Sequence, residues 1–282
     1  GELQSADRNY SQAISLCQES SKLDQEQGFG IKKCNDLYLL LLNRGSVRLN
    51  TPSNPQYKQE ALRDLREANT LRDRPDALIS QNLARAEELN GLFSRADKNY
   101  NLAISMTANE VNPYWLRSAM VKLQLGDYKG GTDLLKRVEN RFPDAPEVKA
   151  ASATFLWAAA SRATVATATQ VTTTKTAAVV DSDSGGDNNN NNGKKKTTKY
   201  DFNAVLNNNN NNNSNNNSNN NINLTTMEPR EYQIEAQRKF LEIPDRQRLK
   251  FIDPQYVQET IAWPPIMIEG VTAIAKKVGD VK

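Results

Sequence analysis

A short stretch of sequence occurs twice in this chain in nearly the same form. Residues 5–15 read SADRNYSQAIS and residues 95–105 read RADKNYNLAIS, so an Ala-Tyr-Ala pattern followed by Ile recurs at one spacing. Residues at this spacing share a helix face, and such self-similarity is typical of repeat proteins, whose units stack on one another. A generic amphipathic helix is the alternative, but it does not explain the recurrence. We therefore expect helical repeats, with residues 1–18 as the second helix of a repeat that lacks its first.

The clearest single unit spans residues 112–146. It contains an amphipathic run with Trp115, a break at Gly126, a second run with Leu135 on its apolar face, and a closing Pro143. Two amphipathic runs joined by a Gly turn and closed by a Pro predict a helix-turn-helix hairpin. In length and layout this unit resembles one tetratricopeptide repeat.

The resemblance to the tetratricopeptide repeat family extends over residues 1–146. It implies an all-α solenoid of about three and a half helical hairpins. Gly45, Ala84 and Ala119 take equivalent positions, where neighbouring helices must approach closely, whereas Gly131 replaces the usual Ala. A polar connection is expected from Ser20 to Ile31, with the next helix beginning near Lys32.

Three regions follow from the composition along the chain. Residues 1–170 are expected to form the repeat array, closed by a capping helix from residue 146 to residue 170, because a repeat array must cover its last apolar face. Residues 171–226 contain long Asn tracts and are expected to be a disordered linker, since they offer little apolar surface to offset chain entropy. Residues 227–282 regain a folded composition with helical periodicity.

The composition argues against catalysis, metal binding and nucleic-acid binding. The chain has no histidine, 2 cysteines, 36 basic residues and 33 acidic residues. Without histidine, the commonest general base and zinc ligand is missing, and the balanced charge does not favour a nucleic-acid partner. Cys17 and Cys34 could form one disulfide or lie apart as small buried residues; the scarcity of disulfides inside cells favours the second interpretation. We expect no enzyme activity, no cofactor and no metal.

The first helices of successive tetratricopeptide repeats line a concave groove, so the resemblance predicts a partner-binding surface. The predicted groove residues, taken helix by helix, are Leu39, Leu42, Ser46 and Leu49, then Gln81, Arg85 and Glu88, and then Leu116, Met120 and Leu123. A largely apolar groove suits an amphipathic helix or an extended apolar peptide. Relatives that clamp acidic chaperone tails carry Asn where this chain has Ser46, Arg85 and Met120, so an acidic tail is not expected. The alternative, that the leucines form ordinary core between repeats, stays open.

The C-terminal region carries a second resemblance. A helical repeat array followed by Asp-Pro-x-Tyr and Trp-Pro-Pro-x-Met resembles plastid and cyanobacterial repeat proteins of thylakoid systems. The residues that carry it are Asp253, Pro254, Tyr256, Trp263, Pro264, Pro265 and Met267. The resemblance implies a non-catalytic scaffold in the chloroplast, associated with thylakoids, that assists assembly of a photosynthetic membrane complex and binds proteins such as photosystem subunits. The alternative is a permanent structural subunit at the periphery of such a complex.

Residues 228–282 hold too little apolar mass to fold alone. We therefore expect them to fold back on the array, with Trp263 inserted between helices, or to dock on a partner. The longest apolar run, at residues 37–42, is far short of the ~20 residues that span a bilayer, so any membrane association is expected to be peripheral, through a partner. The chain begins at Gly1, and we expect a processed protein from which a targeting segment was removed.

Overall fold

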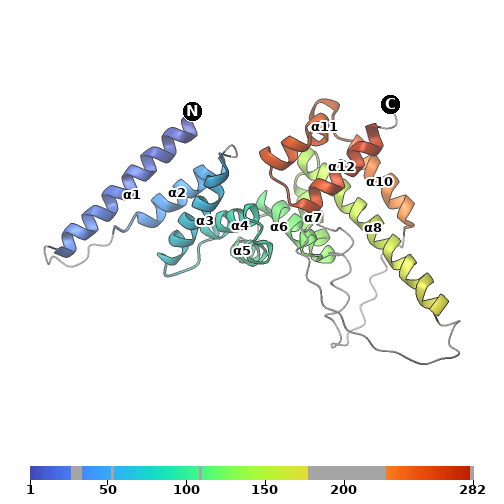
Figure 1. Ribbon diagram of the computed structural model, residues 1–282, viewed down its shortest axis with the longest axis horizontal. Coiled ribbons are helices and arrows are strands. Elements are labelled where there is room, and N and C mark those ends of the chain that lie inside the picture. Colours follow the sequence, from blue (N-terminus) through green and yellow to red (C-terminus); the bar gives the residue numbers. More distant parts are fainter. Residues whose placement is uncertain (27–33, 52–53, 108–109, 177–226, 280–282) are drawn as a thin grey trace, which may run out of the picture.

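The computed structural model describes residues 1–26, 34–51, 54–107, 110–176 and 227–279. Every regular element in these ranges is a helix, and none of these residues forms a strand (Figure 1). The prediction of an all-α fold is confirmed.

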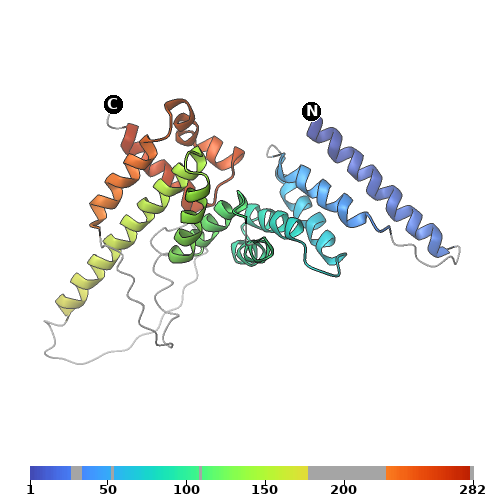
Figure 2. The same cartoon turned by 180° about the vertical axis from the view of Figure 1, so that it is seen from behind.

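Seven helices make up the first half of the fold. Each of the pairs α2–α3, α4–α5 and α6–α7 packs closely across a short connection, and the pairs follow one another along the molecule, with α1 beside α2 (Figures 1 and 2). The helices are α1 (Glu2–Glu26), α2 (Leu37–Leu49), α3 (Pro55–Thr70), α4 (Ala77–Leu89), α5 (Phe93–Met106), α6 (Tyr114–Gln124) and α7 (Tyr128–Arg141).

Side-chain caps define where three of these helices begin. The side chains of Asn54, Asp76 and Asp127 each accept a hydrogen bond from a main-chain N–H in the first turn of α3, α4 and α7. Such caps satisfy donors that have no partner within the helix. Gly126, just before α7, has a φ of 82°, a left-handed conformation that glycine adopts without strain. The tight turn predicted here therefore has a local cause.

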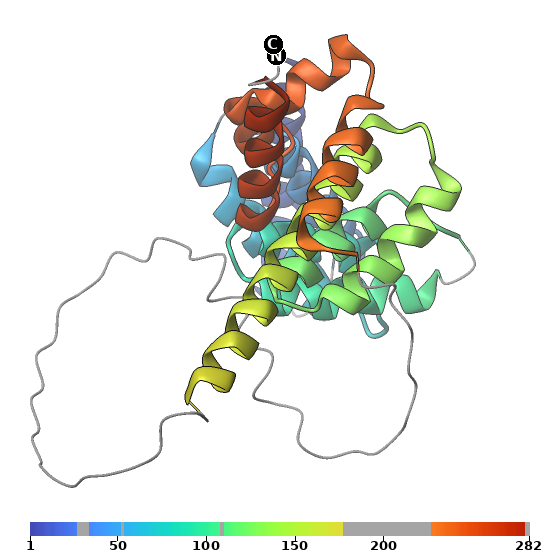
Figure 3. The same ribbon diagram turned by 90° about the vertical axis from the view of Figure 1, so that its right-hand side faces the viewer.

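The second half contains one long helix and a C-terminal segment that returns to it. α10 and α12 pack against α8, and α12 also reaches α6 (Figure 3). The elements are α8 (Pro146–Thr176), α10 (Pro229–Leu241), α11 (Asp245–Ile252), the π-helical turn η2 (Tyr256–Thr260) and α12 (Pro265–Gly279). α8 extends past the boundary predicted at residue 170. Most of the predicted linker, residues 177–226, lies outside the described residues.

The predicted capping helix is not the outermost layer. Its residues from Ala150 to Ala160 are buried on nearly every side, because α7 covers one side and α10 and α12 cover another. A helix that is apolar all round is typically enclosed. The small residues of this stretch allow close contact: a Cβ on Gly270 of α12 would lie 2.5 Å from Thr154 Cγ2.

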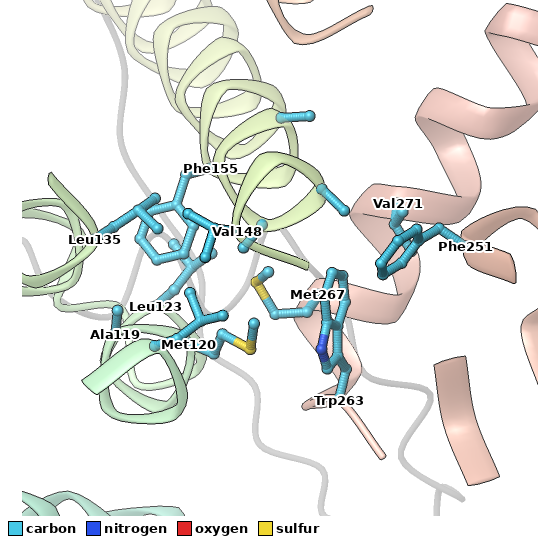
Figure 4. Packing of buried hydrophobic residues seen from close by; sticks show 14 of the residues in the cluster. Ala119, Met120, Leu123, Leu135, Val148, Phe155, Phe251, Trp263, Met267 and Val271 are labelled. Carbon is cyan, nitrogen blue, oxygen red and sulfur yellow. The ribbon is translucent and has the colours of Figure 1, made fainter. Parts of the chain in front are cut away.

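The largest hydrophobic cluster joins α6, α7 and α8 to the C-terminal segment. Met267 of α12 points toward Met120 of α6, and Trp263 lies beside it (Figure 4). Trp263 also contacts Phe251, with ring centroids 5.7 Å apart. The C-terminal segment therefore shares a core with the last helical pair, as expected of a segment that cannot bury its apolar residues alone.

The N-terminal region differs from expectation in two ways. α1 continues to Glu26, although a connection was predicted from Ser20, since no Gly or Pro interrupts the helix before residue 28. Cys17 and Cys34 form a disulfide with Cα atoms 5.7 Å apart, so the preferred interpretation as separate thiols is wrong. A buried ion cluster also connects α1 and α3 to α2, because Arg48 of α2 binds Asp7 of α1 and Asp64 of α3, each at 2.7 Å.

Gly131 lies where α7 packs so closely against α6 and α8 that the methyl group of the usual Ala has no room. A Cβ at this position would lie 2.9 Å from the carbonyl oxygen of Ala119 and 3.0 Å from Phe155 Cε1. Because the carbonyl belongs to the main chain of α6, it cannot move without shifting that helix. We expect Gly131→Ala to lower the free energy of unfolding by about 1–3 kcal/mol, as overpacking does, despite the better helix propensity of Ala. Denaturant unfolding measures this change.

Gly279→Ala is the matched control, because nothing lies within 4 Å of a Cβ at that position. The control should leave the unfolding midpoint nearly unchanged. Equal stability of the two variants would contradict the close packing of α6, α7 and α8.

Candidate protein-binding groove

A buried ionic cluster lies on the inner faces of α4 and α6. Glu88 is 4% exposed and pairs with two arginines: Arg117 of α6, which contacts both carboxylate oxygens, and Arg85, at 3.1 Å. Tyr100 of α5 donates its hydroxyl to Glu88 Oε2 at 2.8 Å. Arg85 and Glu88 are three residues apart on α4, so both side chains point to one face. The cluster thereby fixes two guanidinium groups at the surface between α4 and α6.

The environment of this cluster changes the acidity of its members. Burial alone would raise the pKa of Glu88, but the positive charges of Arg117 and Arg85 outweigh it and hold the pKa below its usual value. Burial, together with the charge of Glu88, raises the pKa of Tyr100 well above its usual value. The cluster at neutral pH therefore contains a carboxylate, a neutral phenol and two guanidinium groups.

The two arginines bind the main chain of the returning C-terminal segment. Arg85 donates to the carbonyl oxygens of Ile261 and Ala262 at 3.0 and 3.2 Å, and Arg117 donates to the same two oxygens at 3.2 and 2.6 Å. Ala262 has a φ of 46°, a left-handed conformation that non-glycine residues rarely adopt. The arginines therefore hold a sharp turn immediately before the Trp-Pro-Pro sequence.

Two further polar contacts continue along the segment. The indole Nε1 of Trp263 donates to Glu147 Oε1 at the start of α8, at 3.0 Å. The main-chain N–H of Ile266 donates to Gln124 Oε1 at the end of α6, at 2.9 Å, and this contact is buried. Main-chain groups of residues 261, 262 and 266 therefore meet side chains of α4 and α6, and the Trp263 side chain meets α8, an arrangement that recognises a turn of polypeptide.

A cavity of about 400 Å³ opens beside the docked turn. Its walls come from α4, α5, α6, α7 and the beginning of α8, and they include the side chains of Arg85, Arg117 and Glu147 that hold residues 261–263. The remaining wall is mostly apolar or aromatic: Tyr100, Pro113, Tyr114, Leu116, Val138, Phe142, Ala145 and Val148. An apolar cavity with a few converging polar groups has the character of a ligand-binding site.

The structure brings together the predicted groove residues of α4 and α6. Gln81, Arg85 and Leu116 line the cavity, and Glu88 holds both arginines in place. Met120 and Leu123 are completely buried in the core shared with α12, so their prediction as surface for a partner needs correction. Their burial has a simple cause: both lie in the core that α6 shares with α7, α8 and α12. Trp263, 4% exposed, lies in the same core.

The predicted residues of α2 lie elsewhere. Leu42 is buried with Leu65 and Ile79 in a separate cluster, and Leu49 is half-buried against it, as the alternative of ordinary core anticipated. Ser46 donates its hydroxyl within α2 to the carbonyl of Leu42. Leu39 alone of this set is exposed. None of the four lines the cavity beside residues 261–263.

Sequence reasoning missed three residues that make the groove: Arg117, Glu147 and Gln124. Arg117 follows the predicted Leu116 and was the only cation in that turn of α6, a signal that was available. Glu147 and Gln124 gave none, because their partners Trp263 and Ile266 lie far along the chain. Long-range pairs of this kind leave no local pattern.

The described residues contain no cluster of three or more His, Cys, Asp or Glu side chains arranged to hold a metal ion. Across the same ranges, no helix combines the length and apolar content needed to cross a membrane.

Comparisons with known proteins do not assign this chain to a family. No model of a protein family matches it, and neither the curated proteins nor the solved structures contain a match.

Proposed function

We propose that this protein is a non-catalytic scaffold of the tetratricopeptide kind that binds other proteins through the groove between α4, α6 and α8. The observation that carries the proposal is that this groove already holds a polypeptide: two arginines, a glutamine and a glutamate contact successive groups of residues 261–266. Side chains placed to bind main-chain groups suit a peptide ligand.

The helical pairs support the solenoid part of the proposal. Each pair buries its apolar face against the next, and small residues lie at the closest approaches, as at Gly45, where a Cβ would come within 2.8 Å of Leu65 Cγ. Stacked pairs of helices create a concave surface in repeat proteins. The solenoid is taken to comprise about three and a half hairpins followed by α8.

The cellular setting is proposed from the Trp-Pro-Pro resemblance. On that basis the protein works beside thylakoid membranes of the chloroplast as an auxiliary or assembly factor for a photosynthetic complex. The disulfide between Cys17 and Cys34 favours an oxidising compartment.

A permanent structural subunit is the second candidate, favoured by apolar residues on α10 and α11. Ile234, Leu241, Leu249 and Ile252 are each at least 40% exposed. Exposed apolar groups on neighbouring helices are typical of surfaces that another protein covers. In this alternative the C-terminal segment is part of a stable interface with the complex.

Affinity isolation from solubilised thylakoids tests the proposal, with the full chain and the variant Ala145→Phe, which narrows the cavity, as paired baits. A scaffold should recover subunits of a thylakoid complex with the full chain and markedly fewer with the variant. Recovery of thylakoid subunits that resists high salt, depends on α10 and α11 and is unaffected by Ala145→Phe would favour the structural subunit. Recovery of no thylakoid protein would contradict the proposed setting.

A further inference from the structure

The cavity and the docked turn use the same side chains. Arg85, Arg117 and Glu147 line the cavity, and they also bind Ile261, Ala262 and Trp263. A molecule entering the cavity therefore meets guanidinium groups whose hydrogen bonds the chain's own segment already occupies. The volume of about 400 Å³ lies near the lower end of the ~300–1,000 Å³ range of ligand sites, which suits a few amino-acid residues.

The charges of the cavity select against an acidic ligand. The two arginines are balanced by two carboxylates, Glu88 beneath them and Glu147 at the rim. Because the positive charge is compensated, the available interactions are hydrogen bonds to neutral acceptors such as main-chain carbonyls. The side chain of Gln81, also in the wall, makes no hydrogen bond to any described residue, and its amide can both donate to and accept from a main-chain amide.

The walls of the cavity favour an aromatic or proline side chain. The rings of Tyr100 and Tyr114 lie 6.5 Å apart and are inclined by only 8° to each other, and Leu116, Phe142 and Val148 complete an apolar surface. Aromatic side chains bury large areas and prefer contact with other rings. The chain's own occupant of the adjoining surface, Trp263 followed by two prolines, has this chemistry.

The docked turn depends in part on hydrogen bonds for which another peptide can compete. Ala262 is held in a left-handed conformation that is costly for a residue other than glycine. The turn around it is held by the hydrogen bonds of the two arginines and by main-chain bonds from Ile261 to Tyr256 and from Trp263 to Val257. Loss of the arginine bonds leaves the carbonyls of Ile261 and Ala262 without these donors and weakens the turn, whereas α12 keeps its apolar contacts with α6 and α8.

We propose that the cavity receives a neutral, aromatic-bearing segment of a partner protein, and that this segment competes with residues 261–263 for Arg85 and Arg117. This inference rests on the proposed scaffold function and identifies the chemistry of its partner. The C-terminal segment is then an internal competitor: binding of the partner releases the turn at Ala262, and docking of the turn weakens binding.

A capped, fluorescent peptide Thr-Ile-Ala-Trp-Pro-Pro-Ile, with the sequence of residues 260–266, is the probe. It is titrated against the full chain by fluorescence anisotropy, while hydrogen exchange of residues 261–267 is followed in the same samples. We expect binding, and an increase of at least fivefold in exchange at these amides when the peptide is bound. A version of the peptide with glutamate on both sides of the tryptophan should bind at least tenfold more weakly.

Two variants locate the peptide. Ala145→Phe fills the cavity and should weaken binding at least tenfold while leaving exchange of residues 261–267 in the free protein unchanged, because Ala145 makes none of the hydrogen bonds that hold the turn. Gln81→Ala, on the rim, should weaken binding by about threefold, the size of one neutral hydrogen bond. Lys98→Ala, on the exposed side of α5, is the matched control and should have no effect.

Several results would overturn the inference. They are absence of peptide binding to the wild-type chain, equal binding to Ala145→Phe, equal binding of the acidic peptide, or binding without increased exchange at residues 261–267. These outcomes are separable from failure of the proposed function. Recovery of a thylakoid complex that falls with Ala145→Phe, without any binding of the peptide, would support the scaffold and contradict the aromatic segment as its ligand. Peptide binding without recovery of any thylakoid protein would support the inference and contradict the proposed setting.

Discussion

Glu88→Gln is expected to destabilise the protein by about 3–5 kcal/mol at pH 7. The substitution preserves shape but removes the charge that compensates Arg117 and Arg85, and loss of one partner of a buried ion pair leaves the other uncompensated. The hydrogen bond from Tyr100 to Glu88 is weakened at the same time. Urea unfolding of the full chain, followed by circular dichroism, measures the loss.

Glu87→Gln is the matched control, one residue earlier on the same helix. Glu87 is buried toward α5, where Asn99 donates to it at 2.7 Å, and burial raises its pKa above the usual value. A glutamine accepts the same hydrogen bond without the cost of a buried charge. This variant should be as stable as the wild type at pH 7, or slightly more stable. Equal losses for the two variants would contradict the assignment of the ionic cluster to Glu88.

The pH dependence provides an independent check on Glu88. Its pKa in the folded protein lies below the usual value of 4.5, so its contribution is fully present above that pH and is lost as pH falls through the folded-state pKa. Wild-type stability should therefore decline more steeply below about pH 4.5 than that of Glu88→Gln, which has no carboxylate at this position to protonate. Parallel acid profiles of the two proteins would contradict the depressed pKa.

Trp263→Ala is the second substitution with a large expected effect. Trp263 is 4% exposed, contacts Phe251, and donates a hydrogen bond to Glu147, so its removal leaves a cavity and an unpaired carboxylate under the C-terminal segment. Truncation of a buried tryptophan costs about 3–5 kcal/mol. Because Trp263 lies where the C-terminal segment meets the groove, the loss of stability should be concentrated in residues 227–279. Hydrogen exchange by mass spectrometry should show increased exchange there and across α6, with α2 and α3 unchanged.

Trp157→Ala is the control for tryptophan loss in general, because this residue of α8 is only partly buried at the edge of the same cluster. Its effect should be smaller and should not raise exchange at residues 261–267. A uniform increase in hydrogen exchange over the whole chain after Trp263→Ala would show that Trp263 supports global folding and does not specifically anchor the C-terminal segment.

Helix positions were predictable from sequence to the extent that they depend on local pattern. The Gly break at residue 126 and the apolar spacing around Trp115 and Leu135 place α6 and α7 correctly, because periodicity and turn residues act within a few positions. The end of α1 was less predictable. Its last turns, up to Glu26, lack apolar periodicity, and no breaker occurs before residue 28.

The groove was predictable only in part, because its composition depends on contacts between distant residues. Arg85 and Leu116 were selected correctly from the faces of their helices, but nothing near Met120 and Leu123 indicates that a core shared with α7, α8 and α12 encloses them. The pairing of Cys17 with Cys34 likewise depends on how α1 packs against α2. Tertiary packing determines such contacts, and the sequence around each residue carries no local pattern that predicts them.

Residues 227–279 dock on the helical array of the same chain through the groove. The most direct test is to replace residues 207–213 with a specific protease site, cleave the purified chain completely, and pass the product over a size-exclusion column with light scattering. The two fragments should elute together at the mass of the intact chain at 1 μM. This requires a dissociation constant well below 1 μM, and therefore a binding free energy more favourable than about −8 kcal/mol. They should separate when the chain also carries Gly270→Val, which forces α12 away from Thr154. Separation of the wild-type fragments at this concentration would contradict this docking.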